Sequence, residues 1–195
     1  MERIPLFKVY MAEEIDEPIL KVLHSGWIGE GPQVELFEEM LKNYTGNTYL
    51  STVNSGTSAL HLAYHMALYQ DCAKSYQMNN NYEVISTPIT CTATNTPIIA
   101  NGAKIVWADV NPLTGNIDPC DIERKITKNT KAITMVHWGG NPCEIEQINN
   151  MAHNYGIKTI EDAAHGIGMQ YKGKKIGNAS DFTAVSLQAI KSITS

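Results

Sequence analysis

The chain has 195 residues, of which 43% are hydrophobic and 18% charged, proportions that indicate a folded globular protein rather than a disordered one. Its formal net charge is −5 and only Arg3 and Arg124 carry guanidinium groups, which argues against a nucleic-acid-binding protein. The sequence shows no secretory signal, no membrane-spanning run and no CxxC pair, so we expect a cytoplasmic protein with reduced thiols and no membrane partner.

Helical spacing of apolar residues and short apolar runs alternate along most of the chain. The expected elements are helix 33–46, strand 48–53, helix 55–70, strand 82–87, helix 92–102, strand 104–110, helix 118–126, strand 131–138, helix 144–156 and strand 157–162. Gly46 and Gly156 are expected to end their helices, and Asp118 with Pro119 to begin one. Pro97 predicts a break or a late start in its helix.

Strands that alternate with helices predict an α/β fold with three layers, in which helices cover both faces of a mostly parallel sheet. Ligands of such sheets gather at the carboxyl ends of the strands. Residues 172–187 are expected to form a turn-rich hairpin that returns as a strand, and the polar, Asn-rich stretch 70–83 an exposed loop.

The stretch "NSGTSALHL" places Ser55, Gly56 and Thr57 between a predicted strand and a predicted helix. The first N–H groups of a helix bind phosphate, and a glycine there lets the anion approach the backbone. A simple Ser/Thr N-cap explains the same pattern and is the commoner meaning of it.

The stretch "TIEDAAHGIG" puts Glu161 and Asp162 at the end of an apolar strand, shortly before His165. A carboxylate in that place serves as a helix cap, as a metal ligand, or as the partner of a protonated ring nitrogen. The nearby imidazole and the position at a strand's carboxyl end favour a ligand site.

Lys191 follows the apolar run "AVSLQAI". Burying a lysine as a cation is costly, and that cost favours the neutral amine, which forms Schiff bases with aldehydes and ketones. The alternative is an ordinary surface lysine. Ser186 adds a hydroxyl to this segment, and the three motifs together supply what pyridoxal 5'-phosphate (PLP) requires: a phosphate cradle, a carboxylate for the ring nitrogen and a lysine.

The chain closely resembles the DegT/DnrJ/StrS family of PLP-dependent sugar aminotransferases, in "NSGTSALHLA", "GAKIVWADVNPLTGNID", "TKAITMVHWGGNPCEIEQI", "IEDAAHGIG…YKGKKIGNASDF" and "SLQAIKSITS". The resemblance implies the aspartate aminotransferase-like fold (PLP fold type I), with a PLP-binding large domain over 34–195 after an N-terminal arm over 1–33. It also implies a homodimer with active sites at the subunit interface.

Carried over by position, Lys191 matches the lysine that binds the cofactor covalently, and Asp162 matches the acid that pairs with the pyridine nitrogen. The remaining positions that match cofactor contacts are Gly56, Thr57, His165, Ser186 and Gln188. The implied reaction moves an amino group, usually from L-glutamate, to a keto carbon of a nucleotide-linked sugar in deoxyamino-sugar and surface polysaccharide biosynthesis.

The sequence departs from the family pattern in three places. Where many members have an aromatic residue that packs on the cofactor ring, this chain has Ile89 and Cys91. The Asn-rich loop is longer than usual, and family members continue well beyond the lysine into a small C-terminal domain. We therefore expect a large domain that is incomplete at its C-terminus.

Three other functions compete with this one. Sugar dehydratases of the same family carry histidine in place of the lysine, so Lys191 argues against them. A truncated, non-catalytic relative is the second alternative, and a Rossmann-type nucleotide-binding domain the third, although no GxGxxG follows the first strand. His61 and His65 have metal-ligand spacing, but the sequence offers no third ligand beside them, and we expect no metal.

Overall fold

The computed structural model describes residues 9, 11–69, 81–191 and 193. The helices are α1 (Asp16–Ser25), α2 (Pro32–Thr45), α3 (Gly56–Leu68), α4 (Thr92–Ala100), α5 (Pro119–Lys125) and α6 (Ile145–Tyr155), with short 3-10 helices at Glu13–Ile15 and Trp138–Gly140. The strands are β1 (Glu83–Ser86), β2 (Lys104–Trp107), β3 (Thr130–Val136), β4 (Lys158–Ala163), β5 (Gln170–Tyr171), β6 (Lys174–Lys175) and β7 (Phe182–Val185).

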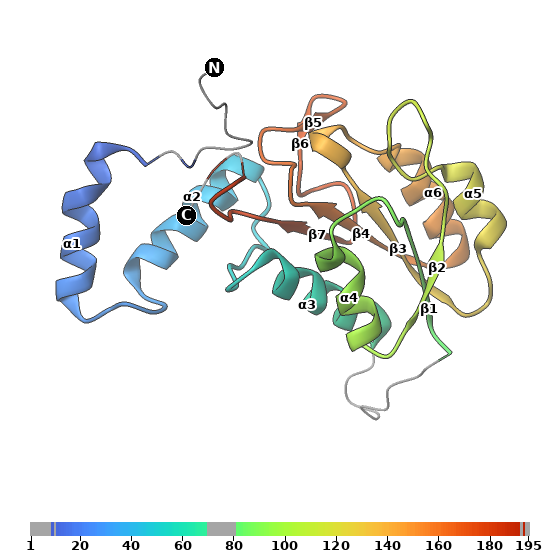
Figure 1. The fold of residues 1–195 in the computed structure, drawn as a ribbon, viewed down its shortest axis with the longest axis horizontal. Coiled ribbons are helices and arrows are strands. Elements are labelled where there is room, and N and C mark those ends of the chain that lie inside the picture. Colours follow the sequence, from blue (N-terminus) through green and yellow to red (C-terminus); the bar gives the residue numbers. More distant parts are fainter. Residues whose placement is uncertain (1–8, 10, 70–80, 192, 194–195) are drawn as a thin grey trace, which may run out of the picture.

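A 5-stranded sheet in the order β2-β1-β3-β4-β7 forms the centre of the molecule, and every neighbouring pair in it is parallel. All its strands therefore end at the same edge. Figure 1 shows the helices around this sheet, with α3 and α4 on one side, α5 and α6 on the other, and α1 and α2 beyond the β7 edge. The predicted three-layer α/β/α fold is confirmed.

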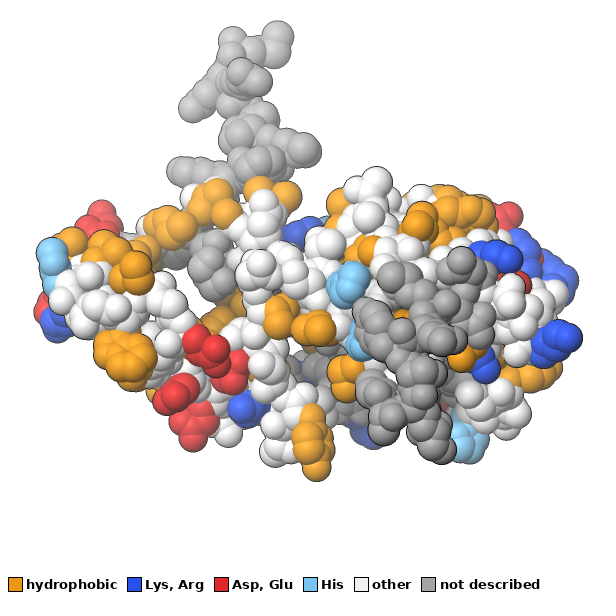
Figure 2. Space-filling model, turned by 90° about the horizontal axis from the view of Figure 1, so that it is seen from below, with side chains coloured by type: hydrophobic (Ala, Val, Ile, Leu, Met, Phe, Trp, Pro, Cys, Tyr) orange, Lys and Arg blue, Asp and Glu red, His pale blue; other side chains and the backbone are white. Residues whose placement is uncertain are grey.

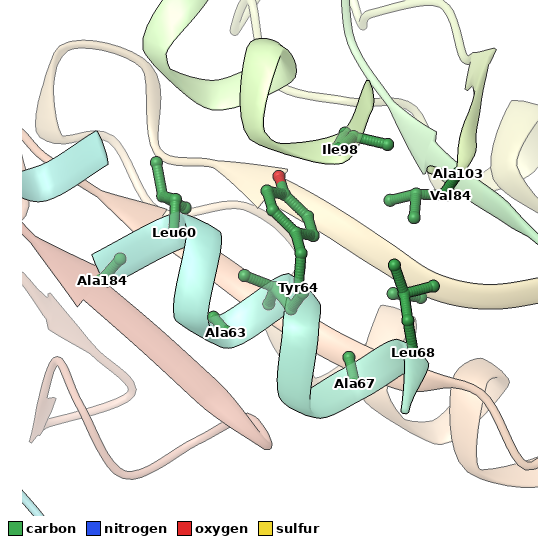
Figure 3. Close-up of a cluster of buried hydrophobic side chains, with 11 residues drawn as sticks. Leu60, Ala63, Tyr64, Ala67, Leu68, Val84, Ile98, Ala103 and Ala184 are labelled. Carbon is green, nitrogen blue, oxygen red and sulfur yellow. The ribbon is translucent and has the colours of Figure 1, made fainter. Parts of the chain in front are cut away.

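Alternate residues of each strand face opposite layers, so the sheet has a separate core on each face. Val84, Ala132 and Ile160 pack with α3 and α4 around the buried Tyr64 (Figure 3). The strand residues that alternate with these face the other layer, where Ile133 and its neighbours pack with α5 and α6. The near-continuous burial of β3 and β4 follows from this double coverage.

Local signals for helix ends are confirmed. Gly46 and Gly156 adopt left-handed conformations just after α2 and α6, with φ of 76° and 65°. The Asp118 side chain accepts a hydrogen bond from the Cys120 N–H and caps α5, and Pro119 is its first residue. Strands β6 and β7 lie within the predicted segment 172–187, but the hairpin begins earlier than predicted, since its first strand is β5 (Gln170–Tyr171).

The strand predicted over 48–53 is wrong. A strand needs a neighbouring strand to accept its backbone hydrogen bonds, whereas Thr52 donates its N–H to the Glu38 carboxylate at 2.6 Å and Tyr49 donates to the Asn47 side chain. The backbone here is satisfied by side chains instead of a sheet.

Two further expectations about helices were wrong or incomplete. Pro97 neither breaks nor delays its helix, because α4 begins at Thr92 and continues past the buried proline ring to Ala100. The sequence patterns also missed α1. The loop expected over 70–83 lies outside the described residues except for its end, and the domain boundary at 33/34 stays a prediction.

Neither α1 nor α2 has a buried residue. Several of their apolar side chains are exposed, among them Leu20, Leu23, Leu36 and Met40, and Figure 2 shows apolar groups on the surface of this part of the molecule. Within the described ranges, no helix is long and apolar enough to cross a bilayer.

The central strand should be sensitive to loss of volume. We expect Ile133→Ala to lower the free energy of unfolding by about 2–5 kcal/mol, because it leaves a cavity under α6 where the side chain is completely buried. Ile99→Ala is the control, since Ile99 is 64% exposed and its truncation should change stability by less than about 0.5 kcal/mol. Urea unfolding of both variants checks this, and equal losses would contradict it.

Candidate active site

The predicted site residues lie at the carboxyl edge of the sheet. Asp162 is in register with Val136 of β3 and Ala184 of β7, near the ends of all three strands. The segments that carry Cys91, His165, Ser186 and Lys191 leave from this same edge, after β1, β4 and β7. The parallel sheet therefore brings together residues that are far apart in the sequence.

The N-terminus of α3 lies against the segment that follows β7. A Cβ atom added to Gly56 would meet the Ser186 Cβ at 3.2 Å and its Oγ at 3.5 Å, so glycine permits this close approach. Ser55 caps the helix by accepting the N–H of Ser58 at 3.1 Å. The N–H groups of Gly56 and Thr57 then lack an intrahelical acceptor, as at any helix start, and point toward the side that an anion would occupy.

Asp162 has its carboxylate fixed by two donors and is only 5% exposed. The Thr94 hydroxyl donates to Oδ2 at 2.6 Å, and the Ala164 N–H donates to Oδ1 at 3.1 Å. Each oxygen retains a further lone pair that can accept a hydrogen bond from a ligand.

The charges of Lys191 and Asp162 both act on the His165 imidazole. Partial desolvation of the ring lowers the pKa of His165 below its ordinary value, the positive charge of Lys191 lowers it further, and Asp162 opposes both. Lys191 is half-buried in a turn in which its N–H donates to the Gln188 carbonyl at 2.7 Å. Lys191 and Asp162 therefore both lie close enough to His165 to act on its charge.

The turn after β3 forms a wall beside His165. The Trp138 and His165 rings lie edge to face with centroids 6.4 Å apart. A Cβ on Gly140 would come within 2.9 Å of the His165 carbonyl oxygen, and its φ of 82° also favours glycine. The buried Asn116 side chain holds this turn, since it accepts the Trp138 N–H and donates to the Asn141 carbonyl.

Glu161 does not join this site. It points to the opposite face of the sheet, where its Oε2 lies 2.8 Å from Nε2 of His137, and both side chains are fully buried. His137 Nδ1 accepts the Cys143 N–H, so its proton is on Nε2 and is donated to Glu161. Burial raises the pKa of the Cys143 thiol to about 12.

The side chains of the remaining candidates, Cys91 and Gln188, make no hydrogen bond within the described residues, although their backbone groups do. Cys91 is exposed at the residue before α4, and its side chain does not cap the helix. Gln188 is exposed, and its N–H lies 3.4 Å from the Ser186 hydroxyl oxygen. Among the described residues, no group of three acidic, histidine or cysteine side chains is arranged to hold a metal ion.

The sequence patterns missed Thr94, Asn116 and the pairing of His137 with Glu161. Strand alternation alone indicates that Glu161 and Asp162 face opposite layers, and this signal was available in the sequence. Nothing local links Thr94 to Asp162, because 68 positions separate them.

Comparison with known proteins decides the family. A profile of the DegT/DnrJ/EryC1/StrS aminotransferase family matches residues 9–195. The chain belongs to this family. The spore coat polysaccharide biosynthesis protein SpsC of Bacillus subtilis is 39% identical over 93% of the chain and 44% of its own length. The UDP-4-amino-4,6-dideoxy-N-acetyl-beta-L-altrosamine transaminase of Campylobacter jejuni is 35% identical over 95% and 48%.

Solved structures of aminotransferases share the fold. PseC of Helicobacter pylori, an aminotransferase involved in the biosynthesis of pseudoaminic acid, superposes with a TM-score of 0.89 at 30% identity, over 99% of this chain and 50% of its own. NtdA of Bacillus subtilis, solved with the cofactor PMP, gives 0.79 at 31% identity over 94% and 40%. The chain of this family member spans about half the length of the relatives it matches.

The geometry of this family member fits pyridoxal phosphate, the cofactor that the family uses. The close approach of Gly56 to Ser186 gives a compact place for a phosphate at a helix N-terminus. Asp162 offers a fixed carboxylate on the same edge, and Lys191 an amine beside it. These are the groups that the cofactor's phosphate, ring nitrogen and aldehyde require.

The buried pair of His137 and Glu161 should act as a unit. We expect His137→Leu to lower the free energy of unfolding by about 3–5 kcal/mol, because it leaves the Glu161 carboxylate buried without its donor. The double variant His137→Leu/Glu161→Met should recover most of that loss, since the uncompensated charge is gone. Urea unfolding measures all three proteins, and strictly additive losses would contradict the coupling.

The nearness of Lys191 to His165 can be tested by titration. In the native chain the His165 imidazole should gain its proton at a pH below 6.5, because desolvation and the lysine charge both disfavour the cation. Lys191→Met should raise this pKa, and Asp162→Asn should lower it. NMR of the imidazole protons measures it, with the distant His153 as the unaffected control. An unchanged His165 titration in Lys191→Met would contradict the geometry.

Proposed function

We propose that this chain forms the cofactor-binding part of a PLP-dependent sugar aminotransferase. The reaction would transfer an amino group from an amino acid, L-glutamate in the first instance, to a keto carbon of a nucleotide-linked sugar. The observation that carries the proposal is the meeting of Lys191, Asp162 and the Gly56–Ser186 contact at one edge of the sheet. We place the protein in the cytoplasm.

Each group has a separate task in this proposal. The N–H groups of Gly56 and Thr57 and the Ser186 hydroxyl would bind the phosphate. Asp162 would accept a hydrogen bond from the protonated ring nitrogen. Lys191 would bind the aldehyde carbon covalently, and His165 would lie over the ring. When bound, the cofactor supplies an electron sink for the carbanion formed at the substrate carbon.

Lys191 would also act as the base. Its free amine would take a proton from one carbon of the substrate–cofactor system and return it to another. His165, neutral at pH 7 because its pKa is lowered, adds no positive charge that would oppose protonation of the amine. Gln188 would help to hold this turn through its carbonyl, which accepts the Lys191 N–H.

The nucleotide-linked substrate is supported by the relatives, one of which is named as a transaminase of a UDP-linked amino sugar. SpsC is named for the biosynthesis of the spore coat polysaccharide, and PseC for the biosynthesis of pseudoaminic acid. Both support a role in surface-sugar biosynthesis. We further propose a homodimer, for which the exposed apolar side chains of α1 and α2 offer a surface.

A sugar dehydratase of the same family is the alternative activity. Retention of Lys191 favours the aminotransferase, because only a lysine amine would bind the cofactor's aldehyde covalently, and the dehydratases carry histidine at this position. A non-catalytic relative is disfavoured by the intact partnerships of Asp162 and by the Gly56–Ser186 approach.

Borohydride reduction in the presence of PLP tests the proposal. It should attach a pyridoxyl group to Lys191, which peptide mass mapping identifies. Both this chain and the longest polypeptide that its locus encodes are treated, with Lys175 as an internal control because it is engaged over the Tyr44 ring far from the site. Absence of label on Lys191 in both polypeptides would overturn the proposed function.

A further inference from the structure

Thr94 is the only hydroxyl that the described structure places on the Asp162 side chain. Its Oγ1 lies 2.6 Å from Asp162 Oδ2, and the threonine side chain is completely buried. A hydrogen bond of this length to a carboxylate belongs to the strong class. It joins the first turn of α4 to the end of β4.

The direction of the hydrogen bonds around Thr94 is fixed. A hydroxyl has one proton, and that of Thr94 is directed to the ionised carboxylate. Thr90 Oγ1 lies 2.6 Å from Thr94 Oγ1, so Thr90 must be the donor in that contact. The two threonines form a short chain that ends on Asp162, and a donor behind Thr94 strengthens the bond in front of it.

Thr94 has its position set independently of Asp162. The next residue, Asn95, accepts the Ser86 hydroxyl at 2.7 Å and donates to the Thr87 carbonyl at 3.0 Å. These bonds tie the first turn of α4 to the end of β1. The contacts of Asn95 therefore help to fix the position of the Thr94 hydroxyl without the help of Asp162.

We infer that Thr94, supported by Thr90, is a positioning residue that orients the Asp162 carboxylate toward the ring nitrogen of the cofactor. The inference rests on the proposed function. Thr94 Oγ1 and the Ala164 N–H each occupy one lone pair of the carboxylate, which restricts its rotation about χ2. The lone pairs that remain then have a fixed direction, and the bond to the ring nitrogen costs less ordering entropy.

The test compares the dissociation constants of PLP and of its analogue in which carbon replaces the ring nitrogen. Both compounds make the same contacts with the phosphate site and with Lys191, so their ratio isolates the interaction at the nitrogen. The measurement uses the polypeptide that borohydride reduction labels at Lys191, either this chain or the longest product of its locus. The preference for PLP is the dissociation constant of the analogue divided by that of PLP. Thr94→Val should reduce this ratio about tenfold, because loss of a hydrogen bond to a charged group changes an equilibrium constant by at least about that factor.

Matched variants separate positioning from stability. Thr94→Ser keeps the hydroxyl and should keep the preference. Thr130→Val removes another buried hydroxyl, at the opposite end of β3, and should lower both affinities equally or not at all. The unfolding free energy of each cofactor-free variant records the structural loss.

The outcomes distinguish the two claims. If the wild-type protein shows no preference for the ring nitrogen, the proposed role of Asp162 fails and this inference fails with it. If the wild type shows the preference and Thr94→Val retains it in full, the inference alone is overturned. A reduced preference in Thr94→Val, together with an unchanged one in Thr94→Ser and Thr130→Val, supports it.

Discussion

The parallel pairing of β3, β4 and β7 is the constraint on which the rest of the site depends. Backbone hydrogen bonds hold Val136, Asp162 and Ala184 side by side, so the segments after these strands start from a common edge. Ser186 and Lys191 reach the neighbourhood of Asp162 for this reason alone. The N-terminus of α3 completes the arrangement, because α3 packs across β3, β4 and β7 and directs its first turn at Ser186.

The alternation of side chains along β4 gives two adjacent carboxylates different surroundings. Asp162 faces α4, where the Thr94 hydroxyl and the Ala164 N–H hold it in place while lone pairs remain for a ligand. Glu161 faces the other layer, where the His137 imidazole satisfies it within a closed core. The buried pair links the ends of β3 and β4. The backbone N–H of His137 also donates to the backbone carbonyl of Asp162. Asp162, the residue proposed to bind the ring nitrogen, thus lies next to a buried polar pair that stabilises its strand.

The part of the molecule formed by α1 and α2 differs from the sheet and its covering helices. Its helices bury no residue, and Trp27 and Ile28 between them are 63% and 75% exposed. The relatives are about twice as long as this chain. The groups proposed to bind the cofactor are all carried by the part around the sheet.

Much of the fold was predictable because its signals are local. Helical periodicity, glycine after α2 and α6, and the Asp118 cap act within a few residues, and the alternation of elements implies the parallel sheet. Roles for Lys191, Asp162 and Gly56 could be proposed for a similar reason, since each follows or precedes a recognisable element. The errors at Pro97 and α1 are local, whereas the error at 48–53 concerns longer range: these residues have strand-like composition, yet a strand exists only where another strand supplies its hydrogen bonds.

The sequence by itself determined the types of element, their order and the residue types available for chemistry. Only the tertiary structure decided which of those residues meet: Thr94 with Asp162, Glu161 with His137, and Gly56 with Ser186. The physical reason is that local conformation depends on neighbours within a turn or a strand. Contacts between elements depend instead on how the sheet stacks segments that lie far apart along the chain.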